Sequence, residues 1–114
     1  MNLLVKWIIS AFAVMLGSYL LPDYAVHVSS FVTALVVAAV LGILNVLVKP
    51  VLVILTIPLT IFTLGLFLLV INAVVILMAD ALIGGFSVGG FWWALLFSIV
   101  LTTINGLLNA LAEK

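Results

Sequence analysis

The chain has 114 residues, of which 69% are hydrophobic and only 5% are charged, and its formal net charge is zero. Soluble domains carry about 25% charged residues and must face water over much of their surface, so this composition excludes a soluble protein and predicts an integral membrane protein. The three lysines, without any arginine, form no basic patch for nucleic acid, and the absence of cysteine excludes disulfides and thiolate-bound metals.

The first predicted span covers residues 3–21. Lys6 and Trp7 stand near its start, where a snorkelling amine and an indole suit the headgroup region. A cleaved signal peptide is the alternative, because a lysine before an apolar run is also its signature. We favour the span, because the apolar run is long for a signal and Asp23 lies where a cleavage site needs a small residue.

A polar link, residues 22–30, follows and contains the only histidine, His27. A single histidine without a cysteine, a glutamate or a second histidine nearby is a poor metal site. We therefore interpret His27 as a loop residue at the membrane interface, in preference to a ligand or a proton relay.

The second predicted span covers residues 31–48. Ala34, Ala38 and Gly42 recur at every fourth position, which places them on one helical face where another backbone can approach closely. Asn45 continues this face, and its amide needs a hydrogen-bonding partner in lipid.

Lys49 and Pro50 are predicted to end the second span, because the residue before a proline disfavours the helical conformation. Residues 50–60, bounded by two prolines, are predicted to form a short interfacial or partly re-entrant element. One long, tilted and kinked helix is the alternative.

The third predicted span covers residues 61–79 and has Asn72 near its middle. Asp80 ends it, and the glycine-rich run 84–90 is predicted to turn. The aromatic residues 91–93 then open the fourth span, 93–112, as an aromatic belt would, in preference to a stacking platform for bases or sugars. The small-residue spacing returns in the fourth span at Ala94, Ser98, Thr102 and Gly106, and Asn105 follows this stripe as Asn45 does in the second span.

The second and fourth spans match at an offset of 60 positions, which pairs Ala34 with Ala94 and Asn45 with Asn105. This agreement predicts a duplicated two-helix hairpin whose halves share one orientation, related by an axis along the membrane normal. The predicted fold is therefore an all-α, four-helix transmembrane protein in a single domain, residues 1–114.

The charges separate by predicted side. Lys6, Lys49 and Lys114 fall on one side, and Asp23 and Asp80 fall on the other. Lysines in short loops mark the cytoplasmic side. The protein is therefore predicted to span the bacterial cytoplasmic membrane with both termini in the cytoplasm.

No catalytic set can be assembled from one histidine and three scattered acids, so we predict neither an enzyme nor a cofactor or metal site. The small and polar intramembrane residues have two interpretations, contacts that hold helices together or the lining of a hydrated pathway, and the first is favoured. The candidate set comprises Ala34, Ala38, Gly42, Asn45, Asn72, Ser98, Thr102, Asn105 and Gly106.

An ordered series of motifs extends over nearly the whole chain. It consists of NVLVKPVL at 45–52, LTIPLT at 55–60, TLGLF at 63–67, VINA at 70–73, and Gly-Phe at 85–86 with Gly-Phe-Trp at 90–92. With this series the chain resembles the four-helix, mycobacterial-type phage holins of superfamily IV. The resemblance implies a protein that self-associates in the cytoplasmic membrane and permeabilises it, with membrane lipid and further copies of itself as partners.

The sequence stops at Glu113-Lys114, without the long charged C-terminal tail that is common among lytic holins. Two other functions therefore stay open. One is a non-lytic structural protein with a membrane or envelope partner, and the other is a small channel or carrier.

Overall fold

The computed structural model describes residues 2–112, and within them the chain forms six helices and two short strands. In chain order these are α1 (Leu3–Leu20), β1 (Val26–Val28), α2 (Phe31–Leu47), α3 (Lys49–Leu55), α4 (Ile57–Phe62), α5 (Phe67–Leu82), β2 (Phe86–Val88) and α6 (Phe91–Ala112). The described chain is mostly helical, as the sequence predicts.

The expectation of an all-α chain needs one correction, because β1 and β2 pair as an antiparallel two-stranded sheet. The predicted loop 22–30 and the predicted turn 84–90 thus contact each other. Each strand alternates in burial, so that Val26, Phe86 and Val88 are buried while His27 and Ser87 face outward. Pairing satisfies the backbone groups of both links and still buries their apolar side chains.

The predicted end of the second span at Lys49 and Pro50 corresponds to the boundary between α2 and α3, but the chain stays helical across it. Val48, between α2 and α3, keeps right-handed helical angles, and the helical stretch runs from Phe31 to Leu55, 25 residues. Pro50 is tolerated because it lies in the first turn of α3, where its missing N–H is not needed. The chain departs from this helix at Thr56, whose φ and ψ are −107° and 13°.

The third helix begins later than predicted. Instead of starting at Ile61, α5 starts at Phe67, after α4 and a turn in which Leu64 and Gly65 have φ of +58° and +89°. These left-handed angles end a helix. Among residues 2–112, three helices are long and apolar enough to cross a membrane, and α5, with 16 residues, is a shorter apolar fourth.

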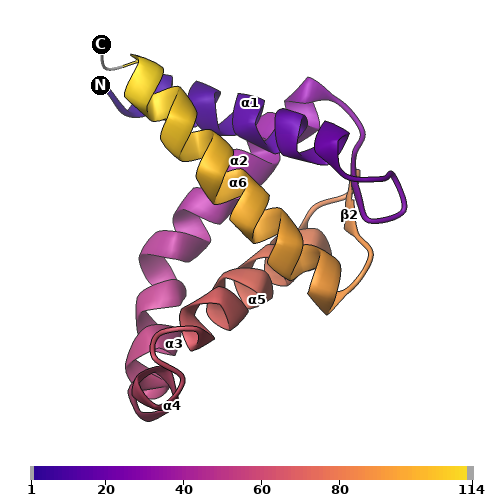
Figure 1. The fold of residues 1–114 in the computed structure, drawn as a ribbon. Coiled ribbons are helices and arrows are strands. Elements are labelled where there is room, and N and C mark those ends of the chain that lie inside the picture. The colour runs from indigo at the N-terminus through magenta and orange to yellow at the C-terminus, as the bar shows by residue number, and fades with distance from the viewer. Residues whose placement is uncertain (1, 113–114) are drawn as a thin grey trace.

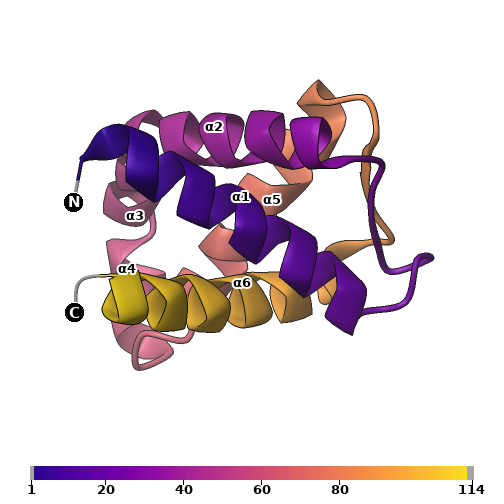
Figure 2. The ribbon, with the colours of Figure 1, turned by 90° about the horizontal axis from the view of Figure 1, so that it is seen from above.

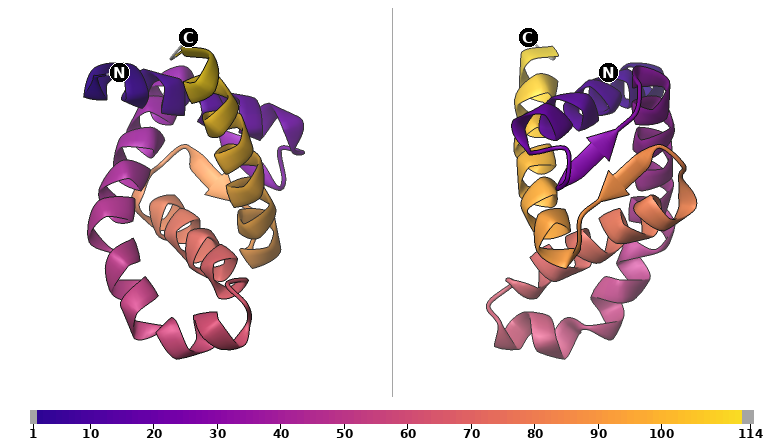
Figure 3. Two further views of the ribbon diagram at one scale, coloured as in Figure 1. Left: turned by 60° about the vertical axis from the view of Figure 1, so that its left-hand side comes forward. Right: turned by 90° about the vertical axis from the view of Figure 1, so that its right-hand side faces the viewer.

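The four long helices form a ring in which α1 packs on α2 and α6, and α5 packs on the same two helices (Figure 1). Figure 2 shows the strands at one end of the molecule, and the start of α1, the end of α6, α3 and α4 at the opposite end. The right-hand view of Figure 3 looks onto the paired strands. Inside the ring lie buried apolar side chains such as Val14, Val37, Ile76 and Phe97.

Candidate functional site

The small residues of α2 divide into two groups. Ala34 and Ala38 are buried against other helices of the chain, whereas Gly42 is exposed. A Cβ added to Gly42 would meet no atom within 4 Å. The chain therefore uses the first part of this stripe for its own packing and leaves the second part open.

The small residues of α6 divide in the same way. Ala94 and Ser98 are buried, and Thr102 and Gly106 are exposed. The space beside Gly106 is also empty to 4 Å. Ala110, four positions further on, is exposed too, so the open part of this helix presents small side chains over two turns.

The predicted asparagines do not gather in one place. The Nδ2 of Asn105 donates to the Ser10 hydroxyl at 3.4 Å, which ties α6 to α1, and the Nδ2 of Asn109 donates to Asn105 Oδ1 at 3.5 Å. Asn45 is exposed on α2 and Asn72 is half-buried on α5, and neither takes part in these hydrogen bonds. The contact between Ser10 and Asn105 joins residues 95 positions apart, and no spacing in the sequence indicates it.

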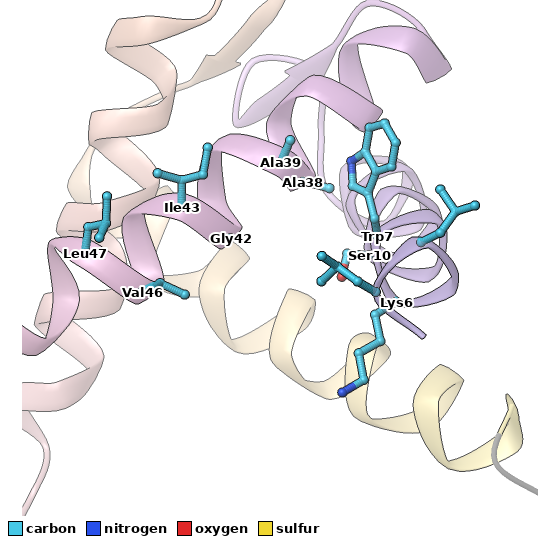
Figure 4. Close-up of a pocket in the computed structure, with 11 residues that line it drawn as sticks. Lys6, Trp7, Ser10, Ala38, Ala39, Gly42, Ile43, Val46 and Leu47 are labelled. Carbon is cyan, nitrogen blue, oxygen red and sulfur yellow. The ribbon is translucent and has the colours of Figure 1, made fainter. Parts of the chain in front are cut away.

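A groove of about 920 Å³ opens between the first half of α1 and the second half of α2 (Figure 4). Ala38, Gly42 and Val46 of α2 line one wall, and Trp7 and Ser10 of α1 line the other. Lys6 also lines it, and it is the one charged side chain there. The sequence analysis placed Lys6 and Trp7 at an interface but did not predict a groove, because that needs the angle between the two helices.

Trp7 has a hydrogen-bonding partner within the protein. Its indole N–H donates to the carbonyl of Leu35 at 2.8 Å, a contact that the sequence did not predict. Figure 4 shows the indole and the Lys6 side chain leaving α1 in different directions. The hydrogen bond fixes α1 against α2 at one edge of the groove.

The strand end of the molecule carries structural polar contacts. An oxygen of Asp80 accepts a hydrogen bond from the Val88 amide at 3.2 Å, which fastens β2 to the end of α5. Trp93 packs edge-on against Tyr24 with ring centroids 5.8 Å apart. His27 is exposed, and within residues 2–112 no three His, Cys, Asp or Glu side chains come together to hold a metal.

Relatives of the chain support the membrane interpretation. It is 38% identical over 119 residues to "Uncharacterized membrane protein YvlD" of Bacillus subtilis (strain 168), covering 97% of this chain and 100% of the relative. It is 41% identical over 117 residues to "Uncharacterized protein SCO3922" of Streptomyces coelicolor, covering 96% of this chain and 94% of that protein. No solved structure matches the chain.

The family comparison agrees with the motif series and the apolar helices. The model of one family, described as mycobacterial 4 TMS phage holin, superfamily IV, matches residues 1–107. A match of this extent includes α1 to α5, both strands and the greater part of α6. The chain therefore belongs to the superfamily IV family of four-helix, holin-like membrane proteins.

Proposed function

We propose that this protein self-associates in the bacterial cytoplasmic membrane through the open face of α6 and acts there as a holin-like protein. The observation that carries the proposal is the exposed series Thr102, Gly106 and Ala110, spaced four positions apart on an apolar helix. Lipid gives no hydrophobic drive for two helices to associate, so contact depends on small residues that let backbones come close.

The proposal includes a duplicated hairpin, and the sheet supports it. The central strand pair is His27 with Ser87, which are 60 positions apart, the offset that relates the two halves of the sequence. Ser29 N–H donates to Gly85 O at 2.9 Å and Gly89 N–H donates to Ala25 O at 2.7 Å. The offset of 60 converts each of these two bonds into the other, because Ser29 corresponds to Gly89 and Ala25 corresponds to Gly85. A two-fold axis through the sheet requires this correspondence.

Such an axis gives both hairpins one orientation in the membrane. It puts the strands and Asp80 on one side of the bilayer, and Lys6, Lys49, α3 and α4 on the other. Because lysine marks the cytoplasmic side, we infer that the strand end is external and that both termini are cytoplasmic; Lys114, the third lysine, lies outside the described residues. The short helices α3 and α4 then form an element at the cytoplasmic interface, where the exposed Phe62 contacts lipid.

Permeabilisation is the further step in this proposal. Copies that meet through α6 would bring their Thr102 hydroxyls together, and a ring of several copies would place this polar stripe around a common axis. No charged residue lies in the middle of α6, so the pathway would be uncharged and poorly selective.

A second candidate is a structural membrane protein that does not permeabilise, with a membrane or envelope partner. The hydrogen bond between Asn105 and Ser10 favours it, because that amide fastens two helices of one chain instead of facing a pathway. In this case the asparagines hold the fold together, and the exposed face of α6 still meets another helix.

Two measurements on the same cells test the proposal. Cross-linking in membranes reports self-association, and a potential-sensitive dye reports permeabilisation after induced expression. The informative variant is Gly106→Leu, which fills the open face of α6, and its matched control is Gly42→Leu, which fills an equally open site on α2.

We expect the wild type and Gly42→Leu to form cross-linked oligomers and depolarise the membrane, and Gly106→Leu to lose both. Oligomers without depolarisation at high expression would support the structural candidate. A monomer in all three cases would overturn the proposal.

A further inference from the structure

We propose that the groove between α1 and α2 is a binding site for one anionic phospholipid, with Lys6 holding the headgroup and the apolar walls holding an acyl chain. The proposal is independent of self-association through α6, because the groove lies on other helices. It rests on the volume of the groove, the chemistry of its walls and the position of one cation.

The dimensions suit a lipid. A volume of about 920 Å³ lies within the range of about 300–1,000 Å³ that is usual for ligand sites. The groove is open along one side, which lets a lipid enter from the surrounding bilayer without any movement of the helices. Gly42 has no side chain, and no atom lies within 4 Å of the position of its missing Cβ. An acyl chain can therefore lie directly against the backbone of α2 at this point.

The walls fit a hydrocarbon chain and not a polar ligand. Ala38, Gly42 and Val46 offer only apolar side-chain surface, and the polar N–H of Trp7 is already bonded to Leu35. The Ser10 hydroxyl accepts from Asn105, so it too has a partner within the protein. Lys6 is therefore the one charged group that an occupant meets along the walls that we describe.

The positive charge of Lys6 favours a lipid whose headgroup is negatively charged. Within residues 2–112 the only carboxylates are Asp23 and Asp80, and both lie near the strands, at the opposite end of the molecule. A lysine beside an apolar groove and remote from these carboxylates attracts a phosphate, and basic pockets between membrane helices do bind anionic headgroups.

The test uses the fluorescence of Trp7, which lines the groove. In a background of Trp92→Phe and Trp93→Phe, Trp7 is the only tryptophan. The protein is reconstituted into phosphatidylcholine vesicles, and phosphatidylglycerol or phosphatidylcholine with brominated chains is titrated in. Bromine quenches only when the chain contacts the indole, so the two curves give the preference of the groove for each headgroup.

We expect the affinity of the site for brominated phosphatidylglycerol to be about fivefold higher than its affinity for brominated phosphatidylcholine. This is the effect expected of one lysine near an anionic headgroup. Lys6→Gln is expected to abolish this preference. Lys49→Gln is the matched control, because it removes a lysine that does not line the groove, and it is expected to keep the preference.

Gly42→Leu is expected to reduce quenching by both lipids, because the new side chain occupies the groove, and Gly106→Leu is expected to leave quenching unchanged. Equal quenching by both lipids in the Trp92→Phe and Trp93→Phe background, with Lys6 and Gly42 intact, would overturn the proposal. It would also be overturned if quenching fell as the protein-to-lipid ratio rose, because a second copy would then be the occupant.

Native mass spectrometry of the wild-type protein, with its three tryptophans intact, provides a second measurement if the double replacement impairs folding. One retained phosphatidylglycerol per chain, lost in Lys6→Gln and kept in Lys49→Gln, is the expected result. Retention that is the same in all three proteins would contradict the site.

Discussion

His27 and Ser87 face each other at the centre of the two-stranded sheet, although the helices α2 to α5 separate the links to which they belong. Their partners on either side, Val26 with Val88 and Val28 with Phe86, complete a symmetrical register. The sheet closes the ring of helices at one end, because it joins the link after α1 to the link after α5. Its formation can be tested directly.

Replacing both central residues, His27→Cys with Ser87→Cys, should give a disulfide within one chain on mild oxidation. Paired antiparallel residues have Cα atoms about 4.5–5.5 Å apart, which a disulfide can span. Both side chains are exposed, and the natural chain has no cysteine to interfere. The shift of the oxidised monomer in a non-reducing gel measures the bond.

The control for this experiment is His27→Cys with Gly84→Cys, because Gly84 is exposed but is not the register partner of position 27. It should form the bond much more slowly. Equal rates for the two pairs would mean that the links are mobile loops, as the sequence alone suggests, and not paired strands.

Gly89 should be sensitive to the smallest substitution. A Cβ at this position would lie 2.5 Å from the carbonyl oxygen of Tyr24, a backbone atom that cannot move without disturbing β1. Gly89→Ala is therefore expected to cost about 1–3 kcal/mol of stability, as overpacking does. Gly84→Ala, where nothing lies within 4 Å, is the control and should be near neutral in thermal unfolding in detergent.

The two strands could in principle have been predicted from the sequence, but the pattern that indicates them is weak. Val-His-Val and Phe-Ser-Val each alternate apolar, polar and apolar, which is the period of a strand. Three residues are too few to distinguish a strand from a loop, and each strand exists only because the other one, about 60 positions away, satisfies its backbone. The starts of α2 and α6 were easier to predict, because apolar helical patterns are local.

The start of α5 and the groove show a different limit. The apolar run from Ile61 to Ala79 reads as one span, but Leu64 adopts a left-handed angle that its side chain does not favour. The groove depends on how far α1 and α2 diverge, which the spacing of residues within one helix does not reveal. The small-residue stripes were visible in the sequence, whereas their division into a buried and an open half was not.

Gly17 of α1 packs against the ring of Phe97 of α6. A Cβ here would lie 2.9 Å from Cε1 of Phe97, a ring that is fully buried. We expect Gly17→Ala to lower stability by about 1–3 kcal/mol, because the ring has little room to move. Gly42→Ala, a helical glycine in open space, should instead stabilise by up to about 1 kcal/mol through helix propensity.

A second substitution separates this clash from a loss of backbone freedom. Phe97→Leu shortens the side chain that Gly17→Ala would strike, so the double variant should be less destabilised than the sum of the single variants. Thermal unfolding of the four proteins in one detergent gives the coupling. Strict additivity would show that Gly17 and Phe97 are not in contact.

The proposed orientation in the membrane predicts which cysteines an impermeant thiol reagent can label. Asp23→Cys lies in the exposed link before β1 and should react from outside intact cells. Lys49→Cys lies at the opposite end of the molecule and should react only after the membrane is permeabilised. Labelling of position 49 in intact cells would reverse the orientation, while leaving the fold unchanged.

Asn105 and Ser10 should contribute to stability through the hydrogen bond that joins them, so that the effects of replacing them are not additive. Their hydrogen bond of 3.4 Å joins α6 to α1 in the membrane-spanning part of the fold, and such contacts contribute about 0.6–2 kcal/mol. In a double-mutant cycle, Asn105→Leu and Ser10→Ala should therefore each destabilise, and the double variant should lose little more than Asn105→Leu alone. Asn45→Leu, at an exposed position on α2, is the control and should have little effect on unfolding. If ion flux through liposomes falls in Asn105→Leu while unfolding is unchanged, the amide faces a hydrated pathway and does not fasten the two helices.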